Sequence, residues 1–102
     1  MQRLSIIRYT VNPEAADENI RLSKAVFDEV RWNKPDRLAY GLFRQGDEFI
    51  HVFLNLAEDD SDAVTELPSF KAFQADLLAR CTVPPAPVRQ SVERIDSYGL
   101  PA

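Results

Sequence analysis

This chain of 102 residues has few of the residues that most often reveal a function. It contains a single cysteine, Cys81, so no disulfide can form within the chain, and a cysteine-poor sequence is typical of a reducing cytoplasm. It also contains a single histidine, His51, so a zinc site would lack the second histidine that such sites often use. We therefore expect a cytoplasmic protein with no metal and no cofactor.

Long hydrophobic runs are absent as well. No apolar stretch approaches the roughly 20 residues that span a membrane, and residues 1–11 lack the apolar core and cleavage site of a signal peptide. The sequence shows no internal repeat and no low-complexity segment. The overall composition is 45% hydrophobic and 27% charged, which predicts one globular domain over residues 1–102 that makes no contact with a membrane.

Acidic residues outnumber basic residues in this chain. The chain has 12 basic and 16 acidic residues, a net charge of −4, and no run of Lys or Arg. Binding to a phosphate backbone requires a basic face, so we expect no nucleic-acid partner. The acidic run Glu58-Asp59-Asp60-Ser61-Asp62 lacks the ligand spacing, the glycine and the terminal glutamate of a calcium loop. It therefore predicts a solvated loop.

The most informative stretch is residues 38–56, in which two apolar runs flank Gln45-Gly46-Asp47. This pattern predicts a β-hairpin, and a two-residue type II′ turn at Gly46-Asp47 would pair Gln45 with Glu48. A three-residue turn would shift the register and mix the two faces. With the shorter turn, the aliphatic face comprises Ala39, Gly41, Phe43, Ile50, Val52, Leu54 and Leu56. The aromatic-polar face comprises Leu38, Tyr40, Leu42, Phe49, His51, Phe53 and Asn55.

Local signals predict the elements on the N-terminal side of the hairpin. Residues 4–11 are rich in β-branched and aromatic residues and predict a strand. Asn12, as N-cap, and Pro13 mark the start of a helix that extends to about Arg31. We expect Asn19 to lie on the surface of this helix, with the alternative that it reaches the end of a strand. We expect Trp32 to pack as a plug at the barrel rim or at a dimer contact.

Similar signals predict the elements that follow the hairpin. A second helix begins at Pro68 and carries a buried stripe of Phe70, Phe73, Leu77 and Cys81. On this stripe Cys81 is interpreted as a small buried hydrophobic residue. Residues 82–87 (TVPPAP) predict a stiff extended connector. Residues 88–98 predict a polar strand that lies at the edge of the sheet or is exposed on one side.

The resulting order is β-α-β-β-α-β, which predicts an α+β ferredoxin-like fold with a four-stranded antiparallel sheet. Two helices can cover only one face of such a sheet. We expect the aliphatic face of the hairpin to pack on these helices and the aromatic-polar face to pack on a second subunit. The expected assembly is a homodimer in which two sheets meet as an α/β barrel.

The sequence resembles the dimeric α/β-barrel superfamily, and within it the antibiotic-biosynthesis-monooxygenase-like proteins and an uncharacterised bacterial subgroup. The resembling segments are residues 9–19 (YTVNPEAADEN), 38–40 (LAY), 49–52 (FIHV), 67–74 (LPSFKAFQ), 84–85 (PP) and 97–98 (SY). The resemblance implies the fold and the dimer. Members of the superfamily include cofactor-free oxygenases, haem-degrading enzymes and dismutases. The haem-degrading members use an Asn-Trp-His constellation that is not carried over here, because Trp32 ends a helix and His51 lies within a strand.

His51 and Tyr40 are the candidate catalytic residues, because they share one strand face with Asn55. On that face His51 could accept a proton from a phenolic substrate while Tyr40 or Asn55 orients it. The alternative is a buried histidine that is hydrogen-bonded to a neighbour. The residues expected to line the pocket are Arg8, Leu42, Phe49, Phe53 and Asn55. Arg8 could equally lie in water at a strand edge.

Two hypotheses about function remain open at this point. The chain is either a homodimeric module that binds a small apolar or aromatic molecule, or a cofactor-free monooxygenase-like enzyme that acts on a small aromatic or polyketide-like substrate. An enzyme requires an open cavity beside His51, whereas a barrel filled by Leu42, Phe49 and Phe53 removes one.

Overall fold

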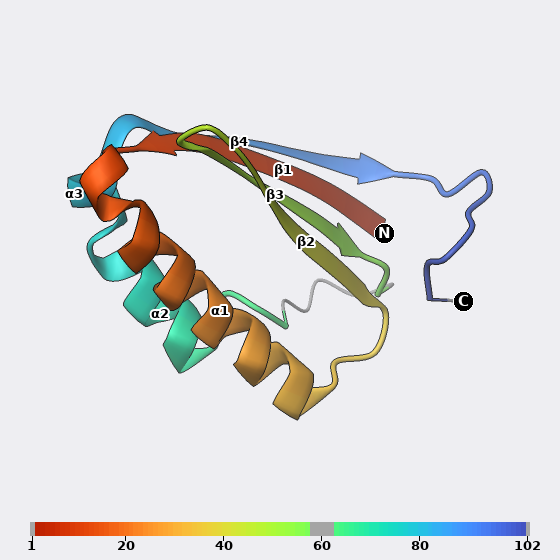
Figure 1. Ribbon diagram of the computed structural model, residues 1–102. Helices are drawn as coiled ribbons and strands as arrows, with labels where there is room; N and C mark the ends of the chain where they lie inside the picture. The colour runs from red at the N-terminus through yellow and green to blue at the C-terminus, as the bar shows by residue number, and fades with distance from the viewer. Residues whose placement is uncertain (1, 58–62, 102) are drawn as a thin grey trace.

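In the computed structural model, which describes residues 2–57 and 63–101, four antiparallel strands form one sheet with all helices on the same side (Figure 1). The elements are β1 (Gln2–Val11), the 3-10 turn η1 (Pro13–Ala15), α1 (Ala16–Asn33), β2 (Leu38–Gln45), β3 (Glu48–Asn55), α2 (Pro68–Ala75), α3 (Leu77–Arg80) and β4 (Cys81–Val92). The sheet order is β2-β3-β1-β4. This arrangement confirms the predicted ferredoxin-like fold. The acidic run at residues 58–62 lies outside the described residues.

None of the helices in the described part of the chain is long and apolar enough to cross a membrane.

The hairpin forms with the predicted two-residue turn. Gln45 pairs with Glu48, and Gly46 has a φ of +60° while Asp47 keeps a negative φ, as a type II′ turn requires. Tyr40 consequently lies opposite Phe53, and Leu42 lies opposite His51. The backbone N–H of Val11 donates to the carbonyl of Asp47 at 3.0 Å, which joins the turn to the end of β1.

The first helix begins differently from the prediction and ends close to it. Pro13 opens the 3-10 turn η1 before α1, and the Asn12 side chain makes no capping hydrogen bond. Helix α1 ends at Asn33, two residues beyond the predicted Arg31. Lys34 terminates it in the left-handed conformation, with a φ of 47° and its N–H bound to the carbonyl of Val30.

The second helix is shorter than predicted, and the last strand begins earlier. Helix α2 breaks at Asp76, the short helix α3 follows, and Cys81 is the half-buried first residue of β4 rather than part of a helical stripe. The predicted connector, residues 82–87, pairs with β1 as part of β4. Prolines fit there because an edge strand directs some of its N–H positions toward solvent. The predicted edge position is confirmed, whereas residues 93–98 lie beyond the strand.

The predicted assignment of the two sheet faces is wrong. The rings of Tyr40 and His51 pack against Phe27 of α1 and Phe73 of α2, so the aromatic-polar face is the one that the helices of the same chain cover. The aliphatic face is open, and Phe43 on it is 60% exposed. The half-buried residues of the open face are Leu4, Ile6, Ile50, Val52 and Leu54. Trp32 is 85% exposed, so it does not pack as a plug within the chain, and Tyr98 is fully exposed.

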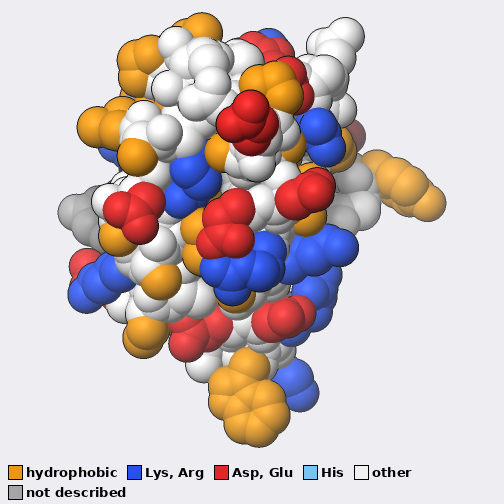
Figure 2. Space-filling model, turned by 60° about the vertical axis from the view of Figure 1, so that its left-hand side comes forward, with side chains coloured by type: hydrophobic (Ala, Val, Ile, Leu, Met, Phe, Trp, Pro, Cys, Tyr) orange, Lys and Arg blue, Asp and Glu red, His pale blue; other side chains and the backbone are white. Residues whose placement is uncertain are grey.

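The surface carries charge of both signs. Figure 2 shows acidic and basic side chains interspersed with hydrophobic ones over the end of the molecule at the left of Figure 1. Several charged side chains pair with near neighbours in the sequence, including Arg21 with Glu18 and Arg31 with Asp28. Exposed pairs of this kind contribute little to stability.

Candidate functional site

The only histidine of the chain lies at the centre of a buried stack of rings between the sheet and the helices. The His51 side chain is 3% exposed, and its ring lies 5.4 Å from that of Tyr9 and 5.9 Å from that of Tyr40, centroid to centroid. The Phe73 ring of α2 covers it at 5.5 Å. Tyr40 is itself held between Phe27 at 4.3 Å and Phe53 at 4.0 Å. This packing fixes the orientation of the imidazole.

Both ring nitrogens of His51 are hydrogen-bonded to tyrosines. The Tyr9 hydroxyl lies 2.8 Å from Nε2, and the Tyr40 hydroxyl lies 2.7 Å from Nδ1. Asn19 of α1, which is fully buried, donates from Nδ2 to the Tyr9 hydroxyl at 3.0 Å. Arg80 donates from Nε to Asn19 Oδ1 at 3.1 Å. Five side chains from five elements therefore form one continuous hydrogen-bonded chain, which we call the relay.

Burial shifts the titration of each ring in the relay. It lowers the pKa of His51 from 6.5 to about 4, so the imidazole is neutral at pH 7. Burial raises the pKa of Tyr9 to about 12, although the hydrogen bond from Asn19 and the charge of Arg80 act in the opposite direction. Burial, and then the nearby Tyr9 phenol, raises the pKa of Tyr40. At neutral pH all three groups are uncharged.

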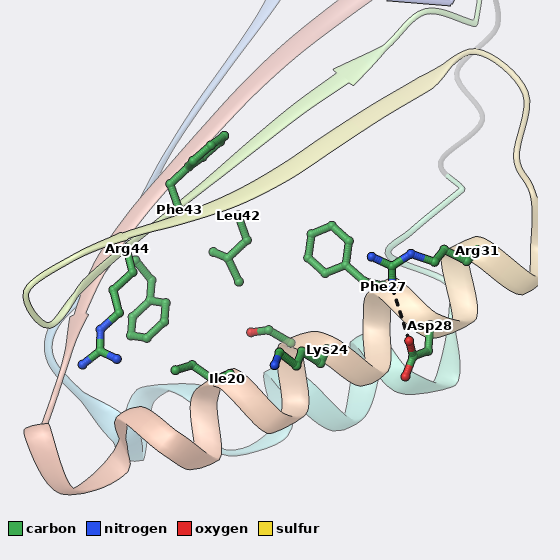
Figure 3. A pocket seen from close by; sticks show the side chains of 10 residues that line it. Ile20, Lys24, Phe27, Asp28, Arg31, Leu42, Phe43 and Arg44 are labelled. Atoms are coloured by element: carbon green, nitrogen blue, oxygen red, sulfur yellow. Dashed lines mark hydrogen bonds and ion pairs between the residues drawn. The ribbon is translucent and has the colours of Figure 1, made fainter.

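A cleft of about 490 Å³ lies in front of the relay, between α1 and the hairpin (Figure 3). Its apolar walls comprise Ile20, Phe27, Leu42 and Phe49, whereas the Phe43 ring points away from it on the open face. Phe27 and Phe49 also contact the relay, because their rings stack on Tyr40 and Tyr9 at 4.3 and 5.8 Å. The volume falls within the usual range for small-molecule sites, so the cleft can hold a ring compound against phenyl faces.

The rim of this cleft is mainly basic. Lys24, Arg31 and Arg44 line it together with one carboxylate, Asp28. Figure 3 shows Arg31 paired with Asp28, and the two side chains lie 3.3 Å apart. Arg44 lies over the Phe49 ring at 5.5 Å and pairs with Asp47 at 3.6 Å. Lys24 makes no ion pair with any of the described residues. An acidic group on a ligand would therefore be attracted to this rim.

Two smaller features extend the site along the sheet. A shallow hollow of about 430 Å³ shares Phe27 and Arg31 with the cleft and is also lined by Tyr40. A separate pocket of about 130 Å³ at the other end of the sheet is lined in part by Phe53 and Asn55. The relay thus lies behind the Phe27 and Phe49 rings that line the cleft, and it reaches the shallow hollow through Tyr40.

The structure brings some of the predicted site residues together and separates others. Leu42 and Phe49 line the cleft, whereas Phe53 and Asn55 line the distant pocket. Asn55 does not orient His51, because both ring nitrogens of His51 are bonded to tyrosines, and Asn55 Oδ1 accepts the backbone N–H of Ala57 at 3.1 Å. Arg8 lies opposite Ile50 on the open face and is exposed, where it pairs with Glu48 at 3.3 Å. It therefore takes no part in the site.

Three residues of the relay were not predicted from the sequence as site residues: Tyr9, Asn19 and Arg80. Asn19 was expected on the helix surface and is instead fully buried. Its position was available from spacing, because Ala16, Asn19, Ser23 and Val26 recur at intervals of three and four residues. Arg80 gave no such signal, since it follows the break at Asp76. Among residues 2–57 and 63–101, no cluster of three His, Cys, Asp or Glu side chains could hold a metal ion.

Comparison with known proteins gives the fold. No protein-family model matches the sequence, and no curated protein matches it either. Among solved structures, the Mycobacterium tuberculosis protein Rv0793 superposes with a TM-score of 0.78 at 19% identity, over 95% of this chain and 100% of its own. A candidate antibiotic biosynthesis monooxygenase from Nitrosomonas europaea gives 0.75 at 9% identity, with 94% of each chain covered. A second candidate, from Caulobacter crescentus, gives 0.74 at 20%, over 90% and 91%. The predicted resemblance to antibiotic-biosynthesis-monooxygenase-like proteins is confirmed as a shared ferredoxin-like fold.

Proposed function

We propose that this protein binds a small aromatic molecule that carries an acidic oxygen, in the cleft between α1 and the hairpin. The observation that carries the proposal is the cleft itself, which combines phenyl walls with a rim of Lys24, Arg31 and Arg44. Aromatic walls favour a ring compound, and a mainly basic rim favours a carboxylate or phenolate.

The test is an NMR titration of the ¹⁵N-labelled protein with 2-naphthoate and with 2-naphthylmethanol, which has the same rings without the charge. We expect saturable shifts at the amides of Ile20, Ser23 and Leu42, and tighter binding of the naphthoate. Leu42→Trp should block binding by filling the cleft, whereas Leu78→Trp, at an exposed position, should leave it unchanged. Shifts confined to the open sheet face, or equal binding in both variants, would refute the proposal.

We also propose that the protein works as a homodimer through its open face, in the reducing cytoplasm that the single cysteine favours. The open face presents Ile6, Val52 and Gly41 side by side at its centre. Contiguous apolar patches of this kind mark interaction sites. In sedimentation velocity at micromolar concentration, the wild type should be dimeric and Val52→Lys monomeric. Ala25→Lys, on an exposed position of α1, is the matched control and should remain dimeric. A monomeric wild type would exclude the dimer.

A second candidate function is a cofactor-free monooxygenase-like activity on a small aromatic or polyketide-like substrate. The observation that favours it is the His51–Tyr40 pair behind the cleft, supported by the fold shared with candidate monooxygenases. Both nitrogens of His51 are occupied by tyrosines, so His51 would accept a substrate proton through Tyr40 rather than directly. This route requires Nδ1 to carry no hydrogen, so it exists only in the Nε2–H tautomer of His51. Oxygen uptake with 1-naphthol, lost in His51→Gln and Tyr40→Phe, would establish it. Uptake that persists in both variants would exclude this role.

A further inference from the structure

The relay has a fixed direction because one of its ends is an arginine. A guanidinium donates hydrogen bonds and accepts none. Arg80 is buried, donates from Nη2 to the carbonyl of Phe73 at 2.8 Å, and donates from Nε to Asn19 Oδ1. Asn19 Oδ1 is therefore an acceptor, and the Nδ2 group of the same amide faces Tyr9 as a donor.

This direction passes through Tyr9 to the imidazole. The Tyr9 oxygen accepts the hydrogen of Asn19, so the one hydrogen of the Tyr9 hydroxyl is available for His51 Nε2 at 2.8 Å. Nε2 is then an acceptor. Because the buried imidazole is neutral at pH 7, it carries one hydrogen, and this hydrogen lies on Nδ1.

The last bond of the relay joins Nδ1 to the Tyr40 hydroxyl. Nδ1–H donates to the Tyr40 oxygen at 2.7 Å, so the hydrogen of the Tyr40 hydroxyl is not used within the relay. Tyr40 also lines the shallow hollow that meets the cleft at Phe27 and Arg31. The hydrogen of the Tyr40 hydroxyl is therefore the one hydrogen of the relay's hydroxyls and imidazole that remains for a bound molecule.

We propose that Arg80 and Asn19 are positioning residues that fix His51 in its Nδ1–H form, so that the Tyr40 hydroxyl donates a hydrogen bond to an acceptor oxygen of the bound molecule. The ligand would then be an aromatic compound with a carbonyl, phenolate or carboxylate oxygen next to the ring that packs on Phe27. The part of this inference that concerns the ligand rests on the proposed function, whereas the part that concerns the tautomer does not.

The hydrogen bonds of the relay could run in the opposite direction between Tyr9 and Tyr40 if Tyr9 donated to Ser23. The Ser23 hydroxyl donates to the carbonyl of Asn19 at 2.7 Å and is close enough to Tyr9 to help lower the pKa of its phenol. If Tyr9 gave its hydrogen to Ser23, Nε2–H would donate to the Tyr9 oxygen and Tyr40 would donate to Nδ1. The two directions therefore predict opposite tautomers of the same histidine.

The tautomer can be measured without any ligand. His51 is the only histidine, so ¹⁵N-histidine labelling and a long-range ¹H–¹⁵N correlation at pH 7 report it without ambiguity of assignment. We expect the pyrrole-type nitrogen to be Nδ1 in the wild type and in Ser23→Ala. An Nε2–H wild type, or a reversal of the tautomer in Ser23→Ala, would overturn the proposal.

Asn19→Asp provides the sharpest variant, because a carboxylate of the same shape only accepts. Arg80 would still donate to it, but Tyr9 would turn its hydrogen toward the carboxylate and accept from Nε2–H. The tautomer should therefore reverse, and Tyr40 should donate to Nδ1. Asn33→Asp adds the same charge at an exposed position and should leave the tautomer unchanged. A folded Asn19→Asp that keeps Nδ1–H would contradict the proposal. If this variant does not fold, the wild type and Ser23→Ala still decide it.

The role of Tyr40 toward a ligand is tested with 2-naphthoate as the probe. Tyr40→Phe should weaken its binding by about tenfold, since a hydrogen bond to a charged oxygen is lost. The exposed Tyr98→Phe should have no effect. Equal affinity in Tyr40→Phe and the wild type would overturn the ligand contact. Failure of the wild type to bind naphthoate would instead refute the proposed function and leave the tautomer result standing.

Discussion

The pH dependence of stability should be dominated by one residue, His51, between pH 8 and pH 5. Its pKa is 6.5 in the unfolded chain and about 4 in the folded one, because burial opposes the charged form. Between these values the unfolded state binds more protons than the folded state, so the free energy of unfolding falls as the pH falls. The stabilising contribution is fully present above about pH 6.5 and is lost as the pH falls toward 4.

The size of the effect follows from the two pKa values. Each pKa unit of difference corresponds to about 1.4 kcal/mol, and the linkage between pH 8 and pH 5 gives a loss of about 2 kcal/mol. This is a large share of the roughly 5–15 kcal/mol that stabilises a small domain. Titration of the neighbours of His51 does not change this loss, because the raised pKa values of Tyr9 and Tyr40 keep both phenols protonated throughout this range.

Urea unfolding of the wild type and of His51→Gln at pH 8, 6.5 and 5 isolates the effect, because the carboxylates titrate alike in both proteins. We expect the wild type to lose about 2 kcal/mol more than the variant over this range. Stabilities that fall in parallel would refute the argument. Direct NMR titration of the single histidine provides a second measurement, and a pKa at or above 6.5 in the folded protein would refute it equally.

Three further predictions concern stability and are all measured by urea unfolding. Tyr9→Phe should lower the free energy of unfolding by about 3 kcal/mol, since it leaves both Asn19 Nδ2 and His51 Nε2 without their partner. Tyr40→Phe leaves only His51 Nδ1 without a partner, at a partly buried position, and should cost about 1 kcal/mol. Similar losses in the two variants would show that the cost does not depend on burial within the relay. Phe73→Ala should cost about 3–5 kcal/mol, because its ring covers Tyr9 and His51, and a loss below about 1 kcal/mol would contradict this packing. Gly46→Ala should cost about 1–2 kcal/mol through its positive φ alone, since an added Cβ meets no atom within 4 Å, while Gly99→Ala, also at positive φ but beyond β4, should change the unfolding free energy little.

Elements with a strong local signal could be predicted from the sequence. The Gly46-Asp47 turn set the register of the hairpin, and that register placed Tyr40, Leu42, His51 and Phe53 on one face as the structure shows. Other features depend on contacts that no local pattern contains. The break at Asp76 allows Arg80 to turn inward to the carbonyl of Phe73, and the prolines of residues 82–87 are accommodated only because β4 is an edge strand.

Which face of the sheet packs on the helices was harder to predict, because both faces of the hairpin are apolar and neither has the polar residues that mark a solvent-exposed face. The deciding information lay in α1 rather than in the hairpin. Its buried stripe contains Asn19 and Ser23, and buried polar side chains require hydrogen-bonding partners. The hairpin residues of the aliphatic face offer none through their side chains, and Arg8, which β1 adds there, is paired with Glu48 in solvent. The face with Tyr9, Tyr40 and His51 offers three. A helix with a polar centre can therefore pack only on the aromatic-polar face, and the same requirement that sets the packing also brings Asn19 to the end of the relay.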